Sequence, residues 1–160
     1  MNINIAYLKE YPQYLPLLAE WMFNTWGHYN PGSSFERAKL KLNEHLNTDS
    51  LPITFIALDD NIPVGTCSLR LNDGIRSDLA PWLGSLYVLP KFRGKGLGEK
   101  LIDAVVNKAS IMDYQKLFLL AFDSTLPNWY KKLGWQLIGV DELNCHPVSV
   151  MEISLNRVPE

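Results

Sequence analysis

A glycine-rich, basic segment lies just past the middle of the chain, where residues 93–98 read Arg-Gly-Lys-Gly-Leu-Gly. Apolar residues recur at helical spacing from Leu97 onward, so a helix is predicted to start here. The first backbone N–H groups of a helix lack partners within the helix and, with the helix dipole, attract phosphate. Glycine lets the backbone approach the anion because no Cβ intervenes, and Arg93 and Lys95 add positive charge. The segment therefore predicts a binding site for a pyrophosphate group.

The spacing of the glycines argues against two common nucleotide-binding motifs. A nucleoside-triphosphate P-loop needs Gly-Lys-Ser/Thr after four intervening residues, and neither the lysine nor the hydroxyl occurs at that spacing. A dinucleotide fingerprint needs G-x-G-x-x-G, but the residue at the third glycine position is Glu99. From the glycines alone, a strand-to-helix turn that uses glycine only for its geometry remains an alternative.

The composition is that of an ordinary globular domain and limits the partners. The 160 residues are 47% hydrophobic and 20% charged, with a net charge of −2, which suits one domain spanning residues 1–160. Nothing in this balance attracts nucleic acid or an anionic membrane. The first residues carry no basic region followed by an apolar run, and no apolar stretch approaches the ~20 residues of a membrane span. We therefore expect a cytoplasmic protein with no nucleic-acid and no membrane partner.

The two cysteines, Cys67 and Cys145, lie far apart and match no metal-ligand spacing. They are predicted to be free thiols in a reducing compartment. His146 has no partner residues nearby that would complete a metal site. We expect no metal.

The elements that position the glycine-rich segment follow the order β-α-α-β-β-β-α-β-α-β-β. Periodicity and turn residues predict strands over residues 3–7, 53–58, 64–71, 82–88, 117–120, 135–140 and 148–155. They predict helices over 14–26, 97–110 and 129–133, and one capped by Ser33 or Ser34 with its apolar face from Ala38 to Leu46. This order is typical of an α/β (α+β) fold: a mixed, mostly antiparallel sheet of about seven strands with helices on both faces.

Two segments resemble the GNAT family of N-acetyltransferases. The stretch from Leu86 to Gly98 resembles the family's central motif, Arg/Gln-x-x-Gly-x-Gly/Ala, with Arg93, Gly96 and Gly98 at its fixed positions. Residues 129–135, Trp-Tyr-Lys-Lys-Leu-Gly-Trp, resemble the family's Phe-Tyr-x-x-Leu-Gly-Phe. Residues 3–73 agree with the family only in the order of their elements. The resemblance implies a GNAT domain that uses acetyl-CoA as its donor.

The resemblance also implies where the coenzyme lies. In this family acetyl-CoA occupies a gap where two central parallel strands splay apart, so its pantetheine would bond to backbone groups of Leu86, Tyr87 and Val88. Its pyrophosphate would bind the N–H groups of the glycine-rich turn, which are those of Arg93, Gly94, Lys95, Gly96, Leu97 and Gly98. The chain departs from the family at Asp123, where relatives often have asparagine. Asn128 is the residue expected to compensate.

The implied chemistry is direct attack of a neutral amine on the thioester in a ternary complex. A backbone N–H at Leu86 would stabilise the oxyanion, and Tyr130 would be the general acid for the leaving thiolate. The alternative for Tyr130 is packing beside the coenzyme. Relatives often place a glutamate base on the fourth strand, but residues 82–86 hold no carboxylate. Asp78 is the nearest acid and the candidate base; Glu36, His28 or a chain of waters are alternatives.

The acceptor predicted by the resemblance is a primary amine of a small molecule or a peptide. Its pocket would lie between the first two helices and the loop 141–146, with Trp26, His28 and Tyr29 as candidate lining residues. Homodimers are frequent in the family, so the resemblance allows a homodimer, but the sequence does not fix the oligomeric state. A second class of function is a non-catalytic acyl-CoA-binding or sensing module. Tyr130 argues against that class, and the missing carboxylate argues for it.

Overall fold

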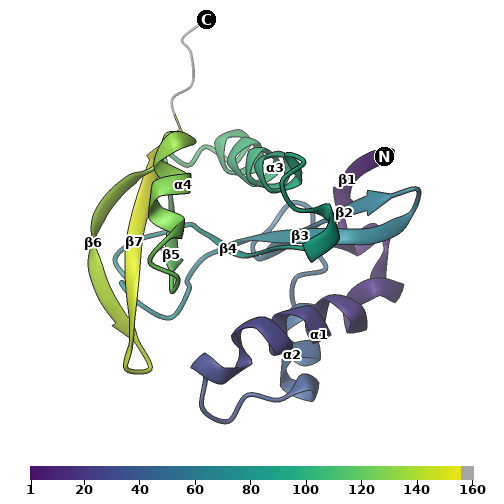
Figure 1. Cartoon of the computed structure of the whole chain (residues 1–160), viewed down its shortest axis with the longest axis horizontal. Helices are drawn as coiled ribbons and strands as arrows, with labels where there is room; N and C mark the ends of the chain where they lie inside the picture. The colour runs from purple at the N-terminus through teal and green to yellow at the C-terminus, as the bar shows by residue number, and fades with distance from the viewer. Residues whose placement is uncertain (156–160) are drawn as a thin grey trace, which may run out of the picture.

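The computed structural model describes residues 1–155, which form one seven-stranded sheet with helices on both faces (Figure 1). The strands are β1 (Ile3–Tyr7), β2 (Ile53–Asp59), β3 (Ile62–Arg70), β4 (Trp82–Val88), β5 (Lys116–Ala121), β6 (Gln136–Leu143) and β7 (His146–Ser154). The helices are α1 (Leu15–Trp26), α2 (Phe35–Asn43), α3 (Leu97–Ile111) and α4 (Leu126–Lys132). Short 3-10 turns lie at Leu8–Glu10, Pro12–Tyr14, Gly27–Tyr29 and Pro90–Phe92. The predicted fold class and order of elements are confirmed.

The sheet order is β1-β2-β3-β4-β5-β7-β6, and every neighbouring pair is antiparallel except β4 and β5. Helices α1 and α2 cover one face, and α3 and α4 cover the other (Figure 1). Leu101 and Val105 of α3 are fully buried against Leu69 and Leu117 of the sheet. Burying each such side chain contributes about 1.5–3 kcal/mol, so these contacts fix α3 on the sheet.

The ends of two helices follow local rules of capping. The Ser34 hydroxyl accepts a hydrogen bond from the Arg37 N–H (3.1 Å), so Ser34 is the N-cap of α2. Gly134 follows α4 with φ of +98°, as expected of the residue after a helix end. The prediction that the face of α2 extends to Leu46 was wrong. The helix ends at Asn43, and His45 turns into the protein, where its Nδ1 lies 2.9 Å from the Thr54 hydroxyl.

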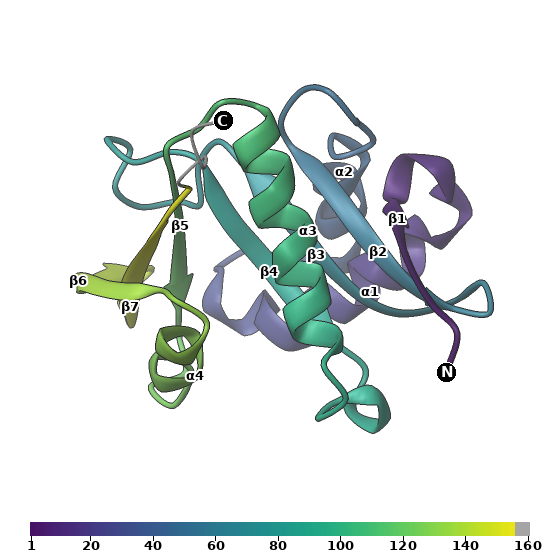
Figure 2. The ribbon, with the colours of Figure 1, turned by 90° about the horizontal axis from the view of Figure 1, so that it is seen from above.

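The two parallel strands at the centre, β4 and β5, meet at one end only. Within residues 1–155 they pair at a single position, Trp82 with Phe118, where the Phe118 N–H donates to the Pro81 carbonyl (3.0 Å). Figure 2 shows the strands diverging from this point. Backbone groups of β4 beyond Trp82 therefore have no strand beside them on that side.

No helix in the described part of the chain combines the length and the apolarity needed to cross a membrane.

Candidate coenzyme and acyl-transfer site

Along a regular strand, the backbone N–H and C=O groups of successive residues point to alternate sides. In β4 this alternation is interrupted part-way along the strand. At its start the Pro81 carbonyl accepts from β5, so odd-numbered residues direct their backbone groups toward β5. At its end the Leu89 N–H donates to the Val64 carbonyl of β3 (2.9 Å), so odd-numbered residues direct theirs toward β3. Since backbone groups alternate sides along a strand, the alternation slips once between these two points.

The slip is a β-bulge in the middle of β4. The register with β3 shifts between Thr66 and Ser68, so that two residues of β4, Ser85 and Leu86, lie opposite Cys67. Ser85 has φ of +52°, a left-handed conformation that is rare for a residue with a Cβ. Beyond the bulge, the even-numbered residues direct their backbone groups away from β3 and toward the gap between β4 and β5. Leu86 is the second residue of the bulge, and extending this alternation back from Val88 directs its N–H toward the same gap.

The glycine-rich turn joins the end of β4 to the start of α3. Gly94 and Gly96 have φ of +76° and +82°, and Gly96 is the N-cap of α3 with no side-chain cap. The Arg93 side chain is tied back to the strand, since its Nε donates to the Val88 carbonyl (2.8 Å) and its guanidinium carbon lies 5.5 Å from the Tyr87 ring centroid. A turn with exposed residues and uncapped N–H groups at a helix start suits a phosphate.

Helix α4 closes the other side of the gap. A Cβ built on Gly98 would lie 3.3 Å from Cη2 of Trp129, so the first turn of α3 and helix α4 touch. A side chain larger than glycine at position 98 would push Trp129 away. The glycine-rich turn and the residues of α4 are thus held next to each other by direct packing.

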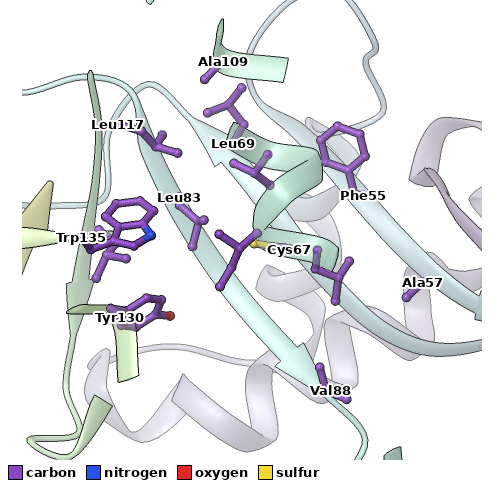
Figure 3. Packing of buried hydrophobic residues seen from close by; sticks show 14 of the residues in the cluster. Phe55, Ala57, Cys67, Leu69, Leu83, Val88, Ala109, Leu117, Tyr130 and Trp135 are labelled. Atoms are coloured by element: carbon purple, nitrogen blue, oxygen red, sulfur yellow. The ribbon is translucent and has the colours of Figure 1, made fainter. Parts of the chain in front are cut away.

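Tyr130 lies in the core beside this contact. It is 5% exposed, and its ring packs against Trp129 and Trp135 with centroid distances of 4.9 and 5.9 Å. Figure 3 shows its hydroxyl directed toward β4. Burial, and to a smaller extent the nearby Cys67, raise the pKa of Tyr130 above its usual range. The hydroxyl is therefore protonated at physiological pH.

Cys67 of β3 is fully buried, and its thiol is held in the protonated form. Its Sγ lies 3.7 Å from the Gly84 carbonyl oxygen, and burial raises its pKa to about 12. A thiol with this pKa stays protonated, and only the thiolate attacks a thioester. Cys145, in contrast, is exposed in the turn between β6 and β7.

The predicted acid and amide residues near the site differ in their surroundings. Asp78 is 63% exposed in the loop before β4 and forms an ion pair with Arg76 (2.9 Å). The hydrogen bond from Arg76 lowers the pKa of Asp78, which makes its carboxylate a weaker base. Asp123 accepts hydrogen bonds from the N–H and hydroxyl of Thr125 (2.8 and 2.7 Å). Asn128 is exposed on α4.

An aromatic cluster joins the α1–α2 connection to the β6–β7 hairpin. The α1–α2 connection lies on the face of the sheet opposite α3 and α4 (Figure 1). Tyr29 stacks on Phe122 (centroids 3.7 Å apart) and meets the edge of His146 (4.9 Å). Asn144 donates to the Tyr29 carbonyl (3.1 Å) and to Oδ1 of Asn30 (2.8 Å). His28 is exposed, with its ring 4.0 Å from that of Tyr29.

Sequence reasoning named Trp26, His28, Tyr29 and the loop 141–146, which contains Asn144, as acceptor-side candidates, but it missed Phe122. No sequence signal marks Phe122, because it meets Tyr29 only when distant segments fold together. A hollow of about 370 Å³ lies beside the cluster and is lined by Phe23, Asn24, Gly27, His28 and Ser33. In the described part of the chain, no three His, Cys, Asp or Glu side chains gather as metal ligands would.

The comparisons with known proteins agree with this geometry. Residues 51–137, more than half of the chain, match the model of the acetyltransferase (GNAT) domain. Over 75 residues the chain is 27% identical to spermine/spermidine N(1)-acetyltransferase of Bacillus subtilis (strain 168). That match covers 45% of this chain and 49% of the relative, about half of its length.

Solved structures share the fold over nearly the whole chain. An aminoglycoside 6'-N-acetyltransferase complexed with coenzyme A has a TM-score of 0.74 and 18% identity, covering 98% of this chain and 99% of that one. The aminoglycoside 6'-N-acetyltransferase from Enterococcus faecium has a TM-score of 0.70 and 19% identity, covering 98% and 99%. A GNAT-family acetyltransferase from Streptococcus pneumoniae has a TM-score of 0.69 and 15% identity, covering 97% and 100%. The chain belongs to the GNAT family of acetyltransferases.

Proposed function

We propose that the protein transfers an acetyl group from acetyl-CoA to a primary amine by direct attack in a ternary complex. One observation carries the proposal: β4 and β5 pair at a single position and then diverge, beside a glycine-rich helix start and a buried tyrosine. An extended pantetheine arm has amides that can bond to the unpaired backbone of Leu86, Tyr87 and Val88. The domain would comprise residues 1–160, of which 156–160 lie outside the described part.

The residues of the turn fit a pyrophosphate. A Cβ on Gly94 would meet no atom within 4 Å, so the surface above the turn is open to an anion. Arg93, Lys95 and the first N–H groups of α3 supply positive charge and donors. Asn128, exposed on the neighbouring helix, is the proposed further contact of the coenzyme.

The acceptor nitrogen would attack the thioester carbonyl carbon with its lone pair, so it must first lose a proton. The Leu86 N–H would then donate to the oxygen that becomes negative. As the carbon–sulfur bond breaks, the Tyr130 hydroxyl would donate a hydrogen bond to the leaving sulfur. Tyr130 would serve as the general acid that protonates the leaving sulfur, and its hydroxyl would regain the proton from the acceptor nitrogen through solvent.

The base that deprotonates the acceptor stays a prediction. Asp78, the carboxylate just before β4, stays the candidate base, although its ion pair with Arg76 makes it a weaker base. A chain of waters to bulk solvent performs the same step without any side chain.

The relatives support an amine as the acceptor. They include a spermine/spermidine acetyltransferase and aminoglycoside acetyltransferases. Both names denote amine acceptors. Use of acetyl-CoA and two free cysteines fit a cytoplasmic enzyme. A homodimer is allowed by the family resemblance, and the oligomeric state stays open.

The test is release of free coenzyme A from acetyl-CoA with spermidine, an aminoglycoside and a peptide N-terminus as acceptors. Because exposed Cys145 reacts with thiol reagents, the products are separated by chromatography. Turnover with at least one amine supports the proposal. Binding of acetyl-CoA without turnover across the panel would favour the sensing module, for which the missing carboxylate on β4 is the supporting observation.

A further inference from the structure

Arg70, at the end of β3, reaches across β4 with its side chain. It pairs with Trp82 in the sheet, and its Nη2 donates to the Ser85 hydroxyl, at the bulge. Its Nη1 donates to Oδ1 of Asp73 (2.8 Å), in the loop that follows β3. One guanidinium thus connects the bulge to a carboxylate anchored outside the sheet.

The guanidinium lies directly against the backbone of β4. A Cβ built on Gly84 would be 3.0 Å from Cζ and Nη1 of Arg70, closer than real Cβ atoms normally come to another group. The Arg70 Nε is buried and finds no acceptor within residues 1–155. Leaving a buried donor unpaired is unfavourable. The position of Arg70 is therefore imposed by its other contacts.

The bulge that Arg70 contacts is itself strained. The φ of +52° at Ser85 is unfavourable for a residue with a Cβ. The bulge also sets which side chains reach the core, since Leu83 and Val88, five residues apart, both lie beneath α3. A regular strand would place them on opposite faces. Loss of the bulge would shift the alternation and turn the Leu86 N–H away from the gap.

We propose that Arg70, anchored by Asp73, is the positioning residue that holds the bulge at Ser85 and so keeps the Leu86 N–H directed into the gap between β4 and β5. The effect of Arg70 on acetyl transfer rests on the proposed function. The effect of Arg70 on the direction of the Leu86 N–H is independent of that function.

The test follows the Leu86 amide resonance in protein labelled with 15N-leucine, together with kcat and KM. The variants are R70M, S85A, S85G and the double variant R70M/S85G. R37M is the matched control, because Arg37 is exposed on α2. R70M and S85A should move the Leu86 resonance and lower kcat about 10-fold, which corresponds to one lost hydrogen bond. R37M should change neither.

Glycine at position 85 supplies the rescue that separates positioning from mere stability. Glycine adopts a positive φ without cost, so the bulge no longer needs its hydrogen bond to Arg70. R70M/S85G should therefore recover at least threefold in kcat over R70M and return the Leu86 resonance toward its wild-type position. A purely structural arginine predicts no such recovery, since Asp73 remains unpaired in both variants.

Each outcome decides the inference. An unmoved Leu86 resonance in R70M and S85A, or no recovery in R70M/S85G, overturns it. Should R70M not fold, S85A decides alone, because it removes one hydroxyl and leaves Asp73 paired. Should the wild type turn over no amine, the proposed function fails, whereas the Leu86 resonance still reports on Arg70.

Discussion

Tyr130 and Leu86 approach the gap from different elements and would act on different atoms of the thioester. The amide of Leu86 comes from a strand that is bulged to present it, and the hydroxyl of Tyr130 comes from a helix packed on the far side. Both are neutral donors. Proposed catalysis therefore depends on stabilising charge on oxygen and sulfur, and not on an acidic or basic side chain of unusual strength.

Replacing Tyr130 by phenylalanine removes the proposed donor to the thiolate and keeps the ring. A hydrogen bond to a charged group is worth about 1.5–3 kcal/mol, so Y130F should lower kcat about 10- to 100-fold. Steady-state kinetics measure the change, and the affinity for acetyl-CoA should stay within about threefold. An unchanged kcat would mean that Tyr130 only packs against the coenzyme.

Replacing Gly94 by alanine adds a single Cβ to the turn and tests whether the turn binds coenzyme A. The space around Gly94 is open, so the effect comes from its φ of +76°, which costs about 1–2 kcal/mol in alanine. Calorimetric titration should show coenzyme A binding weakened about 5- to 30-fold. Gly139 of β6 also has open space but no positive φ, and G139A should bind coenzyme A as the wild type does. Equal affinities in the two variants would remove the turn from the coenzyme site.

Sequence could predict the residues of this site only where they are close together along the chain. Arg93, Gly96 and Gly98 lie within one turn, and their position at a predicted helix start favours a phosphate site over a turn that uses glycine only for its geometry. Arg70 and Ser85 are fifteen positions apart and meet through strand pairing, which no local pattern shows. The positive φ at Ser85 is likewise a property of the pairing, because serine has no preference for it.

A row of buried polar side chains connects the loop after α2 to strands β2 and β3. His45 Nδ1 lies 2.9 Å from the Thr54 hydroxyl, which lies 2.7 Å from that of Ser68. Burial, and then the charge of Arg70, lower the pKa of His45 to about 3. The histidine stays neutral in the folded protein at physiological pH.

This histidine makes stability depend on pH. In the unfolded chain His45 takes up a proton below about pH 6.5, whereas the folded protein holds it neutral down to about pH 3. The unfolded state therefore gains protons, and stability falls as the pH falls. Between pH 7 and pH 5, urea denaturation should show the wild type losing about 2 kcal/mol more than H45N. Parallel losses in the two proteins would contradict the burial of a neutral His45.

The strands and helices were predicted well where periodicity decided them. Strand β4 and the start of α3 have the predicted bounds, because both are bordered by proline or glycine. The end of α2 was missed, because the pattern of apolar residues continues past Asn43 while the chain turns inward at His45. The contact with Thr54, nine residues later, overrode the local helical pattern.

For the whole molecule, an open gap in the central sheet predicts that the coenzyme stabilises the fold. A ligand at about 100 times its Kd adds about 2.7 kcal/mol to a protein that binds it only when folded. For a chain of this length that raises Tm by about 5–10 °C. Thermal denaturation with and without coenzyme A measures the shift, and G94A should show a smaller one at the same ligand concentration. A shift below about 1 °C for the wild type would argue against binding in the gap.

The single backbone pair between β4 and β5 also has a consequence for the protein in a living cell. A sheet normally completes its hydrogen bonds during folding, but β4 and β5 pair at one position, and in the proposed complex acetyl-CoA would bond to the backbone left unpaired. The fraction of molecules that open far enough for a protease to cut them should then fall as that metabolite accumulates. We expect the half-life of this protein to lengthen in cells rich in acetyl-CoA and to shorten in starved ones.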